Sequence, residues 1–322
     1  MTLSRTRLNL KAYAIQACHA GGIDATAVAR VERAIENGLD MLLMERCWAF
    51  MQDTYDIVCK KPWTGGATTG TAAIAVGATT LTVSSADALP ADIVGQYIQV
   101  NAESHWYEIV TRTSDTVLEV RHAYSNESET DLTASAFSIM YPLYDLPTNF
   151  FRIRPEGGGL IDTNSGGGEL AYTNFGVTHY LHAERVGSGE PEAFGLQAKR
   201  HDANQWQLFM YPAPSRAKRY QLVYFRKPGW YDTNVPATSE WKPQATADTN
   251  YVDWPDKLSF VLEAAVAAAV AKEIKPDLYP KLQSDFMYQA SVAASMDRVS
   301  AKPALLSRGS RAMGGTYYRF GS

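Results

Sequence analysis

The sequence predicts an α+β fold with a helical bundle core, an inserted small β-barrel or sandwich domain, a β-hairpin region and an extended C-terminal arm. Three observations support this prediction. Apolar residues recur at three- and four-residue steps near both ends of the chain, as in amphipathic helices. Residues 65–141 instead hold short alternating apolar runs separated by turn residues, as in strands. Residues 301–322 carry four glycines and no acidic residue, a composition that does not favour a packed core.

The N-terminal section predicts two helices. The first covers Leu8–Ala20 and ends at Gly21 and Gly22, and the second is capped by Asp24 and continues through Trp48 and Phe50. We expect residues 1–64 and 142–300 to form one discontinuous helical and β core. Residues 65–141 are then the inserted β-domain and residues 301–322 the arm.

The predicted β-domain contains four strand-like runs: Leu81–Ser84, Ile93–Val100, Trp106–Val110 and Ser114–Val120. Ser, Asp and Gly residues between these runs supply the turns. A small β-module inserted into a helical protein is an addition to a scaffold, and we expect such an addition to make contacts.

Two further β-runs, Gln205–Tyr211 and Tyr220–Phe225, alternate apolar and polar residues and are each followed by prolines. Because proline interrupts a strand ladder, we expect these runs to form a hairpin. Two helices then close the fold, one starting at Asp253 and Pro255 and one near Asp277. The alanines of Ala264–Ala271 favour close helix contacts, within the chain or between copies.

The composition argues against some classes of protein, among them proteins that coat nucleic acid and proteins that span a membrane. The chain has 322 residues, 46% hydrophobic residues and a net charge of −4, as expected for a globular protein. The acidic balance argues against a protein that coats nucleic acid, although it suits the wall of a channel through which DNA slides. The longest apolar run, Leu258–Ala271, is interrupted by Glu263, so we expect no membrane span. The N-terminus lacks the apolar core of a signal peptide, and the three cysteines predict reduced thiols made in a cytoplasm.

No motif predicts an active site. His179, His182 and Glu184 are the nearest group to a metal site, but no third ligand cluster accompanies them, and surface or core histidines are favoured. The glycine clusters at 157–159 and 166–168 lack the lysine of a phosphate-binding loop. Asp256 and Glu263 are explained as helix charges. We therefore expect no catalytic residue, no cofactor and no metal.

Two groups of side chains could bind a partner. Trp106, Tyr107 and Tyr97 could stack on sugar rings, but adjacent strand positions point to opposite faces, so packing in the core is favoured. The arm residues could contact nucleic acid phosphates or an acidic groove on a protein, of which the protein is favoured. The arm residues concerned are Lys302, Arg308, Arg311, Arg319, Tyr317, Tyr318 and Phe320.

The order of parts resembles a known family. The chain shows two N-terminal helices, a β-insert, Leu-Pro-x-x-Phe-x-x-Ile at Leu146–Ile153 and Tyr-Pro-Ala-Pro at Tyr211–Pro214. Tyr-x-Leu-x-Tyr-x-x-Lys-Pro follows at Tyr220–Pro228, and then two long helices. This order, over roughly Asp24 to Val299, resembles the head-to-tail adaptor (head completion, tail tubular or portal-adaptor) proteins of tailed bacteriophages.

The resemblance implies a non-enzymatic structural virion protein, made in the host cytoplasm and located in the neck or tail. It implies a homo-oligomeric ring, expected to be a dodecamer, beneath the portal protein, through which genomic DNA passes without sequence-specific binding. The tail tube, the nozzle and tail fibre proteins are further expected partners, and no membrane is. The arm is expected to contact the portal through Arg308, Arg311, Tyr317, Tyr318 and Phe320. The alternative is a peripheral tail component that binds carbohydrate or a receptor through the β-domain.

Overall fold

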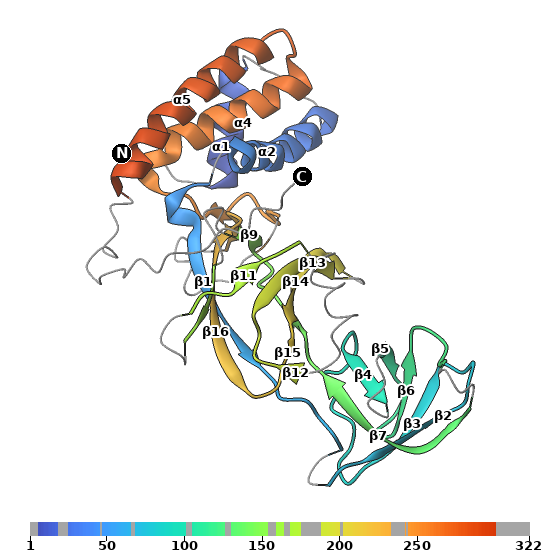
Figure 1. The fold of residues 1–322 in the computed structure, drawn as a ribbon. Helices are drawn as coiled ribbons and strands as arrows, with labels where there is room; N and C mark the ends of the chain where they lie inside the picture. The colour runs from blue at the N-terminus through green and yellow to red at the C-terminus, as the bar shows by residue number, and fades with distance from the viewer. Residues whose placement is uncertain are drawn as a thin grey trace, which may run out of the picture. The chain divides into compact units, whose positions relative to one another are not determined.

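A computed structural model gives the fold of the chain (Figure 1). It describes residues 6–18, 25–45, 47–65, 68–100, 105–125, 130–153, 159–163, 168–174, 188–199, 202–232, 242 and 244–300. The chain divides into two compact units. Unit 1 combines residues 1–51 with 228–322, and unit 2 comprises residues 52–227. The domain boundaries expected from the sequence stay a prediction.

Unit 1 is built around one buried helix. This helix, α4 (Ser259–Ile274), packs against α1 (Arg7–Ala17), α2 (Ala25–Glu45) and α5 (Tyr279–Ser300) (Figure 1). Five alanines of α4 are buried, and these small side chains let the neighbouring helices approach closely. The alanine stretch predicted for close helix contacts therefore makes them within the chain.

Short elements complete unit 1. The 3₁₀ turns η1 (Ala49–Met51) and η3 (Asp256–Leu258) flank helical segments, and β17 (Trp230–Tyr231) pairs with β18 (Tyr251–Val252). Trp48 and Phe50 each pack edge to face on Trp254, with ring centroids 5.5 Å and 4.9 Å from that of Trp254. Such aromatic contacts stabilise a core beyond the area that they bury.

Residues 71–140 of unit 2 form a closed six-stranded barrel in the order β2-β3-β6-β5-β4-β7 (Figure 1). Alternate residues of its strands are buried, as the period of two requires. Closure leaves the sheet without free edges. The strands are β2 (Thr71–Ile74), β3 (Thr80–Ser84), β4 (Tyr97–Val100), β5 (Trp106–Arg112), β6 (Val117–Val120) and β7 (Leu132–Met140).

The rest of unit 2 is also β-structure. One sheet has β16 (Lys218–Arg226) at its centre, with β1 (Gln52–Cys59) on one side and β9 (Phe150–Ile153) and β10 (Leu160–Asp162) also paired to it. A second sheet has the order β11-β13-β14-β8. Side chains from both sheets share one hydrophobic core. The second sheet comprises β11 (Ala171–Tyr172), β13 (Ala193–Lys199), β14 (Asp202–Tyr211) and β8 (Leu143–Asp145), and β12 (Ser188–Gly189) pairs separately with β15 (Ala213–Pro214).

The predicted helical bundle core is wrong. The fold is mixed α+β with more strand than helix among the described residues, and the helices are confined to unit 1. The helix expected to continue through Phe50 ends at Glu45 and is followed by η1 and the eight-residue strand β1. Only Ile57 and Cys59 of β1 are buried, so the alternation that identifies a strand is too short to detect in the sequence.

The predicted hairpin is also wrong. Its two runs are strands, but β14 pairs with β13 and β8 whereas β16 pairs with β1, β9 and β10. The intervening segment contains Pro212, which follows a cis peptide bond, and Pro214. Prolines lack the N–H group that a ladder needs, so this segment leaves one sheet and enters the other. The prolines mark a crossover between sheets.

Candidate interaction surfaces and polar sites

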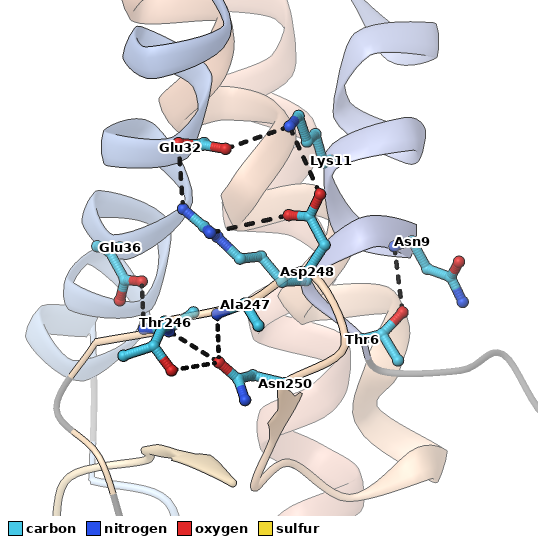
Figure 2. Close-up of polar contacts among 11 residues, drawn as sticks. Thr6, Asn9, Lys11, Glu32, Glu36, Thr246, Ala247, Asp248 and Asn250 are labelled. Atoms are coloured by element: carbon cyan, nitrogen blue, oxygen red, sulfur yellow. Dashed lines mark hydrogen bonds and ion pairs between the residues drawn. The ribbon is translucent and has the colours of Figure 1, made fainter. Parts of the chain in front are cut away.

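A polar network joins α1 and α2 to the loop that precedes β18 (Figure 2). Lys11 of α1 lies 3.2 Å from Glu32 of α2 and 3.9 Å from Asp248 in the loop. Arg7 bridges the same two acids, at 3.4 Å from Glu32 and 3.7 Å from Asp248. Both cations are about 15% exposed. Because each acid meets both cations, the network holds three separate segments together.

The loop itself is fixed by side chains that accept backbone hydrogen bonds. Asn250 accepts from the backbone N–H groups of Thr246 at 2.8 Å and Ala247 at 2.7 Å (Figure 2). Glu36 of α2 accepts from the Trp230 indole at 3.0 Å and from the Ala245 N–H at 3.3 Å. Burial raises the pKa of Glu36 more than these hydrogen bonds lower it. The arrangement is explained by structural support of the loop.

The outward side of α5, here called the α5 face, is exposed and uncharged. It consists of Met287, Tyr288, Ser291, Ser295 and Met296. Tyr288 is 66% exposed, and no residue between Phe286 and Met296 carries a charge.

The opposite side of α5 packs into unit 1 through Phe286, Ala290 and Ala293. There the buried carboxylate of Asp297 accepts the Ala49 N–H at 2.7 Å. A solvated helix surface normally carries charged residues, so the α5 face is suited to contact another protein.

Helix α1 presents a second surface with exposed apolar and aromatic side chains. Leu8 is 54% and Tyr13 40% exposed. Burial raises the pKa of Tyr13, and the charges of Glu263 on α4 and Asp285 on α5 raise it further. Tyr13 therefore lies close to both of these helices, on a helix that carries no acidic residue.

A pocket of about 300 Å³ lies in unit 2, where the barrel meets the second sheet. Among its lining residues, Asp145 binds Lys199 at 2.6 Å and Gln207 at 2.7 Å. Lys60, also in the lining, pairs with Asp92, and the Lys60 amine lies 5.5 Å from the centre of the Tyr141 ring. Amide, carboxylate and ammonium groups beside an aromatic ring form a surface able to bind a small, hydroxyl-rich molecule.

A buried ionic cluster lies in the other sheet. The Lys218 amine is 2.5 Å from the Asp162 carboxylate and also contacts Glu190. The Lys218 and Asp162 side chains are only 5% and 9% exposed. Burial lowers the pKa of Lys218, but hydrogen bonds with the two acids raise it by more. No sequence motif predicted this cluster, although strand alternation places Lys218 on the same face as the apolar Tyr220 and Leu222.

The aromatic residues considered for sugar binding do not form a free platform. Tyr107 is buried in the barrel core, and its hydroxyl donates to the Ser125 carbonyl at 2.9 Å. Trp106 and Tyr97 are half-buried, with ring centroids 6.4 Å apart, and Tyr97 also packs edge to face on Phe209 of β14. The expectation that neighbouring positions of this strand face opposite sides is confirmed.

Several predicted residues lie outside the described part of the chain. These include His179, His182 and Glu184 of the weak metal candidate and the arm residues Arg308, Arg311, Tyr317, Tyr318 and Phe320.

Asp256 lies in η3 and Glu263 on α4, where burial raises the pKa of Glu263. Within the described residues, no three histidine, cysteine or acidic side chains gather as metal ligands would. None of the described helices has the length and apolar content needed to cross a bilayer.

The chain matches no protein-family model and no curated protein.

Proposed function

We propose that the chain is a non-enzymatic virion protein that forms a ring beneath the portal, joins the phage head to the tail and continues the DNA channel. The order of sequence motifs motivates the proposal, and the α5 face supports it most directly. About three turns of an exposed helix carry Met287, Tyr288 and Met296 and no charge. Such a surface favours burial against a protein, and in a ring it is covered by the next copy.

Two different surfaces with exposed apolar side chains on unit 1 are consistent with a ring. In a cyclic assembly each copy uses two distinct patches, one for each neighbour. The α5 face supplies one patch, and the surface of α1 around Leu8 and Tyr13 supplies the other. A heterologous contact of this kind stays weak until the ring closes, so the chain is expected to assemble on its portal template.

The arm, residues 301–322, is proposed to contact the portal. Its arginines and aromatic residues match the residue types that are enriched at protein interfaces. Ordering an extended segment on a partner costs conformational entropy, and repeating the contact in every copy of the ring offsets that cost.

The decisive experiment is co-sedimentation of the purified chain with the portal of the same virus, followed by negative-stain imaging. We expect rings that cap one end of the portal, and we expect deletion of residues 301–322 to weaken the attachment. A chain that neither sediments with the portal nor forms rings would refute the adaptor function. Attachment that survives the deletion would refute the role of the arm alone.

The α5 face can be tested in the same assay. Tyr288→Glu places a charge at the centre of the face and is expected to abolish rings while leaving the circular dichroism of the helices unchanged. Asn37→Asp is the control, since Asn37 is exposed on α2 and acquires the same charge away from α5. Rings formed equally by both variants would show that another surface joins the copies.

The pocket in unit 2 favours a second candidate, a peripheral tail component that binds carbohydrate. Asp145, Lys199 and Gln207 present linked donors and acceptors in the pocket lining, as recognition of adjacent hydroxyl groups requires. Glycan-array binding that is lost in Gln207→Ala and kept in Trp106→Ala would favour this candidate. Absence of glycan binding by the intact chain would dismiss it.

A further inference from the structure

The ionic cluster of Lys218, Asp162 and Glu190 has the geometry of a reactive site. Lys218 begins β16 and Asp162 ends β10, and the two strands are paired in the sheet. The Lys218 Nζ lies 2.5 Å from Asp162 Oδ2, and the carboxyl carbon of Asp162 is one bond further. An amine and a carboxyl group held this close have a very high effective concentration.

The surroundings of this pair exclude most water. The centre of the Tyr220 ring lies 5.5 Å from the Lys218 amine, and Cys59 of β1 is directly opposite Lys218 in the sheet. Both side chains of the pair are more than nine-tenths buried. Desolvation penalises both charges of a buried ion pair. Moving one proton from the ammonium to the carboxylate removes both charges and gives an amine beside a carboxylic acid.

The third group, Glu190, is placed to move protons. Its Oε1 contacts the Lys218 amine, and its Oε2 lies 3.1 Å from the guanidinium of Arg216. The Glu190 side chain is 48% exposed. The hydrogen bond from Lys218 holds the pKa of Glu190 below its usual range, so Glu190 is ionised in the resting cluster. It can accept a proton once the Lys218 nitrogen has bonded to a carboxyl carbon, because that nitrogen is then strongly acidic.

From this geometry we propose that Lys218 and Asp162 become joined by an intramolecular amide bond. Hydrogen bonds with both acids favour the charged Lys218 in the resting cluster, and transfer of one proton from Lys218 to Asp162 gives a small population of neutral amine beside the protonated acid. The amine of this form attacks the Asp162 carboxyl carbon and forms the Nζ–Cγ bond. Glu190 accepts the proton that the attacking nitrogen releases and passes it to the departing hydroxyl group. The Cγ–O bond breaks, one water molecule leaves through the exposed side of Glu190, and Glu190 returns to its original state. No oxidant, metal or cofactor takes part.

Two other lysine–aspartate pairs in unit 2 show why burial decides the outcome. Lys199 lies 2.6 Å from Asp145, nearly the same distance, but these side chains are 33% and 46% exposed. Lys60 and Asp92 also touch, and both are about half exposed. Water stabilises the charged forms of these exposed pairs, so neither is expected to lose water.

The test is the intact mass of the purified full-length chain under denaturing conditions. We expect a mass lower than that of the sequence by one water molecule, and a tryptic digest in which the peptide containing Asp162 is joined to the peptide containing Lys218. A mass equal to that of the sequence would overturn the proposal and leave the cluster as an ordinary buried ion pair. A loss of water located elsewhere by the digest would overturn it equally.

Three variants sharpen this test. Lys218→Met removes the nucleophile, and Glu190→Gln keeps a hydrogen-bond acceptor but cannot accept the proton, so both are expected to retain the water. Lys199→Met is the matched control and should lose water as the wild type does. Loss of water in Glu190→Gln would refute the role of Glu190. Because the digest of the wild-type protein decides whether the bond exists, a variant that fails to fold leaves the proposal testable.

Discussion

Because α2 and α4 cross closely, we expect Gly38→Ala to destabilise the protein, although helix propensity alone would make this substitution stabilising. Gly38 lies within α2, where replacing glycine by alanine normally stabilises a helix by about 1 kcal/mol. A Cβ atom at Gly38 would lie 2.9 Å from the Val266 Cα and 3.1 Å from its Cγ2. The first of these atoms is backbone and cannot rotate away.

The magnitude follows from the space available. Ordinary contact of a Cβ atom begins at 3.4 Å, so the two helices must separate by about half an ångström at this point. Overpacking of this kind costs about 1–3 kcal/mol. After the propensity gain, we expect Gly38→Ala to lower the free energy of unfolding by about 1 kcal/mol. Asn37→Ala is the matched control, because Asn37 is exposed on α2 and its replacement should stabilise slightly.

The assay is urea unfolding followed by the helical circular dichroism signal. This signal reports on unit 1, which contains all of the described α-helices. A second substitution, Val266→Ala, removes the Cγ2 contact but also costs stability by itself, because Val266 is fully buried. Gly38→Ala is therefore expected to cost less in the Val266→Ala background than in the wild type. If Gly38→Ala were more stable than the wild type by the full propensity gain, the close approach of α2 and α4 would be refuted.

Three further predictions concern buried polar groups. Asp297→Ala leaves the Ala49 N–H without its acceptor, so unfolding experiments should show a loss of about 1–3 kcal/mol, against a smaller loss for Asp297→Asn. Burial raises the pKa of Glu36 in the folded state, so the contribution of Glu36 to the free energy of unfolding falls as pH rises from about 4.5 through that raised pKa. Glu36→Gln should flatten this part of the profile of unfolding free energy against pH. An unchanged profile would contradict the burial of Glu36. Burial raises the pKa of the Cys59 thiol to about 12, so iodoacetamide at mildly alkaline pH should label the half-exposed Cys47 well before Cys59. Equal labelling rates for the two thiols would contradict the burial of Cys59 in the core.

The sequence was informative where one pattern repeats over several turns. The existence of the helices near both ends of the chain was predicted, since α4 and α5 carry apolar residues at helical spacing and are separated by Pro276. Their bounds were predicted less well, because α2 ends at Glu45 rather than Phe50 and α4 begins at Ser259 rather than near Pro255. The strands of the barrel were predictable because their alternation is regular and turns separate them.

Pairing between distant strands was not predictable in this way. β16 pairs with β1, more than 150 residues earlier in the chain, and nothing in either strand specifies the partner. Short strands such as β8 and β10 gain their conformation from the sheet they join and carry too few residues for a pattern. Adjacency in sequence suggested a hairpin for β14 and β16, whereas burial of their apolar faces places them in two sheets.

The candidate sites also differ in how far the sequence could predict them, because one is formed by a single helix and another by distant segments. Uncharged residues at helical spacing could have identified the α5 face from sequence alone, because the run from Phe286 to Met296 lacks charge. The Lys218 cluster could not be assembled, since Asp162 and Glu190 come from separate elements that only the folded sheets bring together. A lysine at an inward position of an apolar strand was its one sequence signal.

The pairing of β1 with β16 has a consequence for the order in which the chain folds. Gln52, at the start of unit 2, lies opposite Phe225 near its end. During synthesis α1 and α2 emerge first, yet α2 packs against α4, which is made only after the whole of unit 2.

Folding of unit 2 brings together the two segments of unit 1, residues 1–51 and 228–322, and replaces a loop of more than 170 residues by a short connection. The entropic cost of closing unit 1 is then lower by about 3 kcal/mol. The nascent α1 and α2 therefore expose apolar side chains until the last helices leave the ribosome, and this interval is when a chaperone would be needed most.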